Sequence, residues 1–269
     1  MKPQLSLKVV TRFVAAFAAV IAATATSSNA QPIASDNAGN YGGGWTSGSN
    51  GGTGFGAWTI DSGNGGNGTG SGGVFIGNST AAGITGMTDP SFGLYANPTG
   101  SGAFSAVKRA FSAPLAVGET FSFQWGINFD SGTGSGTDGA KGFNIYTGGI
   151  SGTSFANVNN GGSPAITLGG TDIGFGYGTN VMTWTFNYSS ATTVVVTAND
   201  RDGVGTYTNT LTVTGAPDAF EFYASGMQGG DSAQPYFNNL SIVPEPSTWA
   251  LIILGSAFIL WRVRTRRLS

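Results

Sequence analysis

Residues 119–129 read ETFSFQWGINF and residues 181–188 read VMTWTFNY. Large apolar residues occupy every second position of both stretches, namely Phe121, Phe123, Trp125, Ile127 and Phe129 in the first and Met182, Trp184, Phe186 and Tyr188 in the second. Alternation with a period of two is typical of a β-strand that buries one face. The two stretches therefore predict core strands, with Trp125 and Trp184 in the core.

Shorter stretches of the same kind predict ten further strands, over residues 54–60, 73–77, 92–96, 104–111, 142–147, 172–177, 192–198, 205–213, 219–225 and 235–243. Between residues 31 and 243 no segment sustains the apolar spacing of a helix. The 46 glycines favour turns between short strands, because glycine weakens helices. The fold class expected from this pattern is all-β, a two-sheet, jelly-roll-like sandwich in one domain.

Composition excludes several chemistries. The chain of 269 residues has no His and no Cys, so it offers no imidazole base, no thiol nucleophile and no Cys/His zinc site. Between residues 31 and 246 only Lys108, Arg109, Lys141 and Arg201 oppose all thirteen carboxylates, which leaves this part at a charge of −9. An acidic body disfavours nucleic acid as a partner. No cofactor is expected.

The amino-terminal end has the layout of a secretory signal peptide. Lys2, Lys8 and Arg12 precede the uncharged run FVAAFAAVIAATA at residues 13–25, and small residues lead to Ala30. We predict a signal peptide over residues 1–30, cleaved between Ala30 and Gln31. A flexible leader is expected over 31–40 and the β-sandwich domain over 41–243.

The carboxyl-terminal end carries three features in order. Pro244-Glu245-Pro246 is followed by 16 uncharged residues from Pro246 to Trp261, and the basic end occupies residues 262–269. A 16-residue helix is about 24 Å long, short for a bilayer core of about 30 Å. We predict a transmembrane helix over 247–261, anchored by Trp249, Leu251, Ile252, Ile253, Leu254, Phe258, Ile259, Leu260 and Trp261. We predict that Arg262, Arg264, Arg266 and Arg267 stop transfer. Basic residues beside a transmembrane helix favour the cytoplasmic side, so this end is expected to stay there.

This order resembles the PEP-CTERM sorting signal of Gram-negative bacteria that make exopolysaccharide. The resemblance covers about 25 residues. It implies an exosortase, a membrane-embedded cysteine protease or transpeptidase, as the partner that reads Pro244, Glu245 and Pro246. It further implies an inner-membrane-anchored intermediate, delivery to the cell surface or extracellular matrix, and exopolysaccharide as an associated partner.

A second resemblance concerns the body. The succession GFGAWTI, GVFIG, FGLYA, a long alternating strand and a closing YFNNLSIV resembles concanavalin A-like jelly rolls over residues 41–243. Enzymes of that fold that cleave glycans carry two carboxyls about 5 Å apart on one strand. Glu119, Glu221 and Glu245 have no such spacing, and Glu221 is expected on the polar face of its strand. We therefore expect no catalytic residue and no enzyme activity.

Two loops have oxygen-bearing side chains that could hold calcium, with Asp130 and Asp138 in one and Asp200 and Asp202 in the other. Plain turns are the favoured interpretation. Among the aromatic residues, Tyr41, Trp45 and Tyr236 are the better candidates for exposure to a sugar. The expected function is a non-catalytic, exported surface or matrix protein, the alternatives being a carbohydrate-binding module, a permanently anchored surface protein and a glycan-active enzyme.

Overall fold

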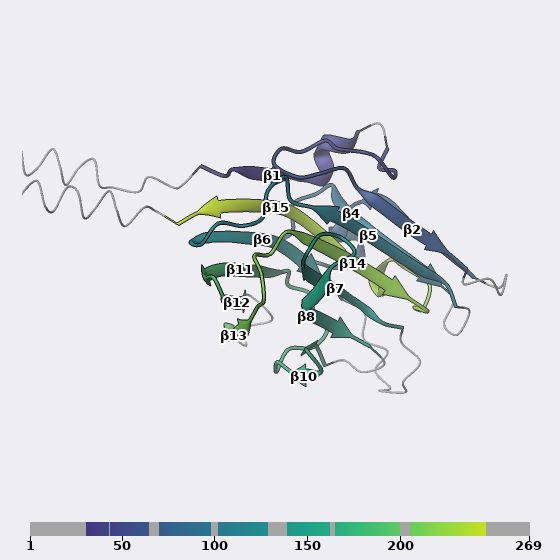
Figure 1. The fold of residues 1–269 in the computed structure, drawn as a ribbon. Helices are drawn as coiled ribbons and strands as arrows, with labels where there is room; N and C mark the ends of the chain where they lie inside the picture. The colour runs from purple at the N-terminus through teal and green to yellow at the C-terminus, as the bar shows by residue number, and fades with distance from the viewer. Residues whose placement is uncertain are drawn as a thin grey trace, which may run out of the picture. The chain divides into compact units, whose positions relative to one another are not determined.

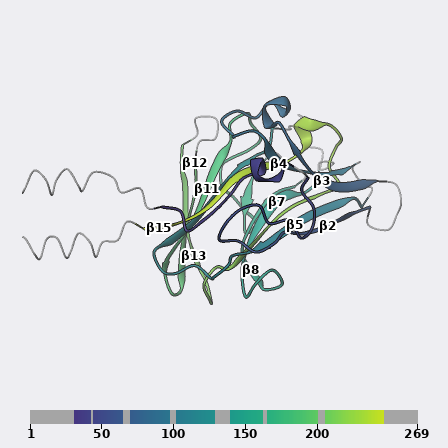
Figure 2. The same ribbon diagram turned by 90° about the horizontal axis from the view of Figure 1, so that it is seen from above.

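The computed structural model describes residues 31–42, 44–64, 70–97, 102–128, 139–161, 165–199 and 205–245. These residues form two antiparallel sheets that face each other (Figure 1). Figure 2 gives the view turned by 90°, in which β11, β12 and β13 lie side by side. The predicted all-β, two-sheet sandwich is confirmed.

The first sheet has eight strands. Its order is β13 (Tyr207–Thr212), β12 (Thr193–Asn199), β11 (Met182–Ser190), β6 (Glu119–Gly126), β15 (Tyr236–Pro244), β4 (Ser91–Asn97) and β3 (Ser71–Gly77), and β1 (Ala34–Asp36) also pairs with β15. The last strand of the chain thus lies inside the sheet. Asn239 adopts a left-handed conformation (φ 52°) at the point where the β15–β6 register shifts.

The second sheet has seven strands. Its order is β10 (Thr171–Asp172), β9 (Thr167–Leu168), β8 (Thr153–Asn160), β7 (Lys141–Thr147), β14 (Ala219–Ser225), β5 (Phe104–Ala110) and β2 (Thr59–Gly63). Three short 3-10 turns complete the described elements, η1 (Ala38–Tyr41), η2 (Ser79–Ala82) and η3 (Asp231–Ala233).

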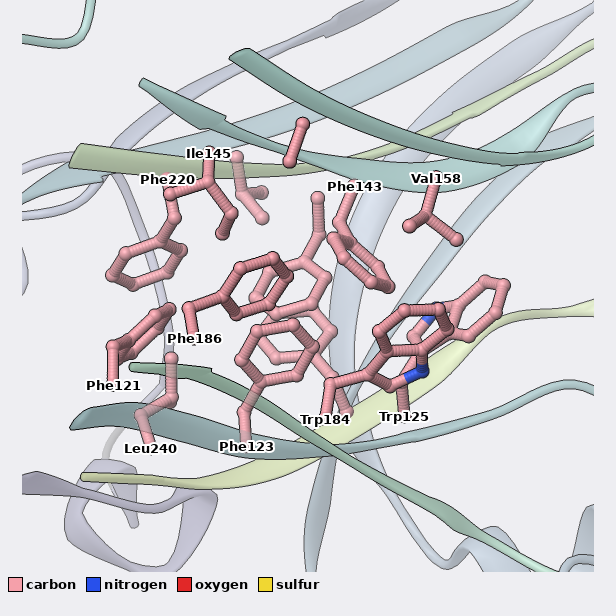
Figure 3. Packing of buried hydrophobic residues seen from close by; sticks show 14 of the residues in the cluster. Phe121, Phe123, Trp125, Phe143, Ile145, Val158, Trp184, Phe186, Phe220 and Leu240 are labelled. Atoms are coloured by element: carbon pink, nitrogen blue, oxygen red, sulfur yellow. The ribbon is translucent and has the colours of Figure 1, made fainter. Parts of the chain in front are cut away.

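An aromatic core fills the space between the sheets. Figure 3 shows Phe123 and Trp184 from the first sheet pointing toward Phe143 and Phe220 from the second. The ring centroids of Phe143 and Trp184 are 4.9 Å apart in an edge-to-face arrangement, which is a favourable geometry for aromatic rings. Trp125 and Trp184 are fully buried, so their predicted place in the core is confirmed.

Two predicted strands are mostly wrong. In 54–60 only Thr59 and Ile60 belong to a strand, β2, while Phe55 forms a single bridge to Phe111. In 172–177 only Asp172 is in a strand. Strand β8 was not predicted. Its sequence is TSFANVNN, in which the buried apolar residues Ala156 and Val158 are small and alternate with asparagine, so that the pattern of large apolar residues is missing.

The expected flexible leader at 31–40 is also wrong over most of its length. Strand β1 pairs with β15, and Ala34, Asp36 and Ala38 are buried. The carboxylate of Asp36 also pairs with Arg109 inside the sandwich, which adds to the contacts that hold the segment. The expected exposure of Tyr41, Trp45 and Tyr236 is wrong too, since all three side chains are buried.

Several predictions lie outside the described residues. They are the signal peptide at 1–30 with Ala30, the helix at 247–261 with its anchor residues, the arginines at 262–267, and the calcium candidates Asp130, Asp138, Asp200 and Asp202. Among the residues that the structure describes, no helix is long and apolar enough to span a bilayer.

Candidate functional site

The sorting motif begins inside the sandwich. Strand β15 ends at Pro244, which lies opposite Glu119 in the pairing with β6, and Val243 lies opposite Thr120. Glu245 follows directly and is exposed, whereas Pro246 lies beyond the described residues. The first proline of Pro-Glu-Pro is therefore part of a central strand, and the glutamate is the first residue outside it.

The chain enters the sandwich beside the place where it leaves. The amide of Ile33 donates to the carbonyl of Ile242 at 2.9 Å, and β1 then runs antiparallel to β15. Figure 1 shows the start of β1 and the arrowhead of β15 at the same end of the sheets. Gln31, the residue expected to follow signal cleavage, is described and exposed. The chain thus enters and leaves the body at the same end of the sandwich.

A buried polar network holds the entering segment. The carboxylate of Asp36 pairs with the guanidinium of Arg109 on β5, and both side chains are fully buried. Tyr41 donates its hydroxyl hydrogen to Asp36 and accepts from the indole of Trp58 at 2.9 Å. Arg109 also donates to the Asn50 side chain and the Gly56 carbonyl. Because the charged groups of Asp36 and Arg109 are fully buried and bonded to each other, the network has a structural role.

A second polar cluster lies on the face of the second sheet turned away from the core. Phe220 and Phe222 of β14 belong to the core, so Glu221 between them points to the opposite face. Its carboxylate accepts from the Asn144 amide at 2.8 Å and from the Tyr146 hydroxyl. Lys108 approaches its other oxygen at 3.4 Å. The predicted polar-face position of Glu221 is found, although the side chain is buried rather than solvated.

The cluster continues across β7 and β8 through Tyr223. Its hydroxyl donates to the carbonyl of Val158 at 3.1 Å and lies 2.9 Å from the Asn159 side-chain oxygen. The side-chain amide of Asn157 links Asn144 and Tyr223, because it donates to Asn144 at 2.8 Å and to Tyr223 at 3.3 Å. The close packing of Val158 and Tyr223 against β7 needs a glycine at position 142. A Cβ there would lie 2.0 Å from the Val158 carbonyl oxygen and 2.6 Å from the Tyr223 hydroxyl.

The electrostatics of the cluster favour hydrogen bonding over proton transfer. Burial raises the pKa of Tyr223 to about 12, and the charge of Glu221 adds to the effect. Burial and the hydrogen bond to Glu221 also raise the pKa of Tyr146. Both phenols therefore stay protonated near neutral pH. The chemistry that this face offers is a set of neutral hydroxyl and amide groups around one carboxylate.

Sequence reasoning did not find this cluster. Its members come from β5, β7, β8 and β14, and only the register of the sheet brings Glu221 beside Asn144 and Lys108. Asparagines at alternate positions of β8 were the available signal, but β8 was not predicted. Within the described ranges, no three acidic residues gather in a group that could hold a metal ion.

Comparison with known proteins identifies the carboxyl-terminal segment. Residues 243–267 match the model of the PEP-CTERM protein-sorting motif. No curated protein matches the chain.

Similar solved structures include a lectin from Bauhinia forficata in complex with GalNAc, with 12% identity, a TM-score of 0.35 and coverage of 69% of this chain and 97% of that one. Arcelin-5, a lectin-like defense protein from Phaseolus vulgaris, has 10% identity, a TM-score of 0.36 and coverage of 69% and 97%. The Ca²⁺-bound exoplasmic/lumenal domain of VIP36 has 10% identity, a TM-score of 0.36 and coverage of 70% and 83%.

The motif match covers the residues at which β15 ends and the chain leaves the sandwich. The polar cluster on the second sheet lies on a different strand set and has no part in that match. The chain is therefore an all-β, two-sheet sandwich that carries a PEP-CTERM protein-sorting motif at residues 243–267, which implies an exosortase-sorted surface protein.

Proposed function

We propose that this protein is an exported, non-catalytic component of the cell surface or the extracellular polysaccharide matrix, and that an exosortase processes it at Pro-Glu-Pro. The observation that carries the proposal is the sorting motif that begins at the end of a central strand. In this scheme the signal peptide exports the body, the carboxyl-terminal helix holds it at the inner membrane, and processing releases or transfers it.

The geometry around Glu245 suits recognition by a protease. Proline biases the preceding residue toward extended backbone, so both Val243 and Glu245 are kept from helix. Val243 is already extended in β15 and Glu245 is exposed beyond it. Proteases bind substrates as extended chain, often by strand pairing. The extended backbone of Val243 and the exposure of Glu245 support the proposal that a protease reads the motif as extended chain.

Mass spectrometry of the mature protein tests the processing step. The protein would be recovered from its native host and from the same host without its exosortase. We expect a carboxyl terminus near residue 245 in the first strain and at Ser269 in the second. A chain that still ends at Ser269 in the exosortase-positive strain contradicts processing and leaves a permanently anchored surface protein.

A pair of matched variants sharpens this test. Glu245→Gln removes the exposed charge of the motif, and Asp61→Asn removes an exposed charge on β2. We expect Glu245→Gln to leave most of the chain unprocessed and Asp61→Asn to be processed normally. Equal processing of both variants would show that the motif carboxylate is not recognised.

The polar cluster favours a second candidate function, binding of a neutral glycan on the outer face of β7, β8 and β14. Tyr223, Asn144 and Asn157 carry hydroxyl and amide groups of the kind that hydrogen-bond sugar hydroxyls, and a bound sugar would share or replace the bonds that these groups make within the cluster. Electrophoresis of the protein through gels that contain the host polysaccharide tests this. Asn157→Ala should abolish retardation, and Thr210→Ala on the exposed strand β13 should not. Retardation that is equal in both variants, or absent in the wild type, contradicts binding at this face.

The absence of catalysis is also a proposal and has its own test. Prolonged incubation of the purified protein with the host polysaccharide should release no reducing ends. Release that persists after repurification would overturn it and would direct attention to the described carboxylates.

A further inference from the structure

We infer that, while the tail is still in the membrane, the end of the sandwich from which the chain leaves rests on the lipid surface through Ile33 and Val117. The inference rests on the proposed function, since it requires the carboxyl-terminal helix to be inserted. Its partner is the interfacial layer of a bilayer, and the contact is apolar rather than electrostatic.

The first observation is where exposed apolar side chains lie. In the described part of the chain, the large hydrophobic side chains that remain exposed are Ile33 at 52% and Val117 at 58%. Ile33 is bonded through its amide to Ile242, two residues before Pro244. Val117 lies two residues before Glu119, which is paired with Pro244. Both side chains therefore flank the strand from which the sorting motif leaves.

The second observation is the character of the loop that carries Val117. Residues 112–118 read SAPLAVG and have no charge, and Ala113, Pro114 and Ala116 are exposed. Two carboxylates beside this loop accept hydrogen bonds from the protein backbone. Glu119 accepts from the Ala116 amide at 2.8 Å, and Asp218 accepts from the Gly149 amide at 2.8 Å. Glu245 is exposed and continues into the tail.

The charges on this end determine the kind of surface. Lys108 and Arg109 lie on β5, the strand that precedes the loop of Val117, and both are paired with carboxylates. Attraction to anionic lipid headgroups needs exposed Lys or Arg. This end of the sandwich therefore suits contact with the apolar part of the membrane interface, where aliphatic side chains lower their free energy by leaving water.

The third observation is the length of the tether. Four residues, 245–248, separate Pro244 from Trp249, the predicted interfacial anchor. A fully extended chain spans at most about 3.6 Å per residue, so this end of β15 stays within about 18 Å of the interface. A tether this short raises the effective concentration of the surface to the order of millimolar. The tether therefore favours a contact that two aliphatic side chains would make only weakly on their own.

Quenching by lipid tests the contact. The chain has no cysteine, so single cysteines can be labelled with a fluorophore without other changes. Ala113→Cys places the label on the loop of Val117. Ser232→Cys places it at an exposed residue just before the opposite end of β15, about 30 Å away along a nine-residue strand. The full-length labelled proteins are reconstituted in phosphatidylcholine vesicles that contain lipid with a spin label in the headgroup.

We expect at least about twofold stronger quenching at position 113 than at position 232. Ile33→Ser added to the Ala113→Cys protein should remove most of that difference. Equal quenching at the two positions, or no effect of Ile33→Ser, overturns the inference. Flotation of the vesicles separates this outcome from failure of the proposed function: if the protein does not float with the lipid, the tail is not inserted and it is membrane anchoring that fails.

Discussion

Asp36 and Arg109 form a fully buried ion pair that joins a strand of the first sheet to a strand of the second. Asp36 closes β1, the segment by which the chain enters the sandwich, and Arg109 lies on β5. The guanidinium also lies 5.0 Å from the ring centroid of Phe55 and 4.9 Å from that of Trp58. The pair fixes the amino-terminal segment against the core.

Asp36→Asn should therefore destabilise the protein strongly. Loss of one partner leaves a buried charge uncompensated, which typically costs about 3–5 kcal/mol. Lys108→Met is the matched control, because Lys108 is the neighbouring base but its side chain is 34% exposed. Glu221, the partner of Lys108, is buried but keeps its hydrogen bonds from Asn144 and Tyr146, so we expect a smaller loss of roughly 1 kcal/mol. Urea unfolding followed by tryptophan fluorescence measures both, and similar losses in the two variants would contradict the role given to Asp36.

Asn238 supports the irregular part of β15. It is buried, accepts from the Ala38 amide at 2.9 Å and donates to the carbonyls of Thr88 and Pro90 at 2.6 and 2.9 Å. Asn238→Ala leaves these backbone groups without partners, so we expect a loss of about 2–3 kcal/mol in unfolding free energy. Asn209→Ala, at an exposed site on β13, should cost less than about 1 kcal/mol. Chemical denaturation of the two variants compares them directly.

Tyr223 should make stability sensitive to alkaline pH. Its pKa is raised from 10.0 to about 12, chiefly by burial, because the folded state favours the protonated phenol. Its contribution is complete below pH 10 and is lost as pH rises through about 12. Tyr223→Phe should weaken this alkaline loss, although about 1 kcal/mol disappears at neutral pH with the hydrogen bonds. Unfolding midpoints across this pH window test it, and an unchanged alkaline profile in the variant would contradict it.

Asp89 should make the stability of the protein sensitive to acidic pH. Burial alone would raise the pKa of its carboxyl, but hydrogen bonds from Ser79 and Thr80 outweigh burial and lower the pKa below its ordinary 3.8. Its stabilisation is therefore present above that value and lost as pH falls through the folded-state pKa. Asp89→Asn should lose about 1 kcal/mol at neutral pH and lose less than wild type on acidification. Asp61→Asn, at an exposed site, should behave like wild type.

The long alternating segments made the fold predictable. Phe121 to Trp125 and Met182 to Phe186 bury one face each, and the structure pairs these two strands with Phe123 opposite Trp184. Prediction failed where tertiary partners override local pattern. Trp45 lies in a glycine-rich stretch that suggests a loop, but its ring packs 4.6 Å from that of Phe92. In the leader at 31–40, nothing in the local sequence indicates that Asp36 pairs with Arg109.

The sorting motif could be predicted from the sequence, whereas the polar cluster could not. Pro244, Glu245 and Pro246 are contiguous, so their pattern can be read from the chain alone. Glu221, Tyr146 and Tyr223 are scattered over strands whose pairing depends on the whole topology. A single sequence contains no signal for that pairing, and the cluster could be found only from the structure.

The position of β15 also determines when the body can become native. This strand lies between β6 and β4 and also pairs with β1, the first described strand. In the proposed export scheme, β15 would be the last of the described strands to cross the membrane. The first sheet stays open along its middle until residues 236–244 have crossed. Under the proposed function, completion of the fold and arrival of the tail at the bilayer would therefore coincide, and the exosortase would meet a newly completed domain rather than a nascent chain.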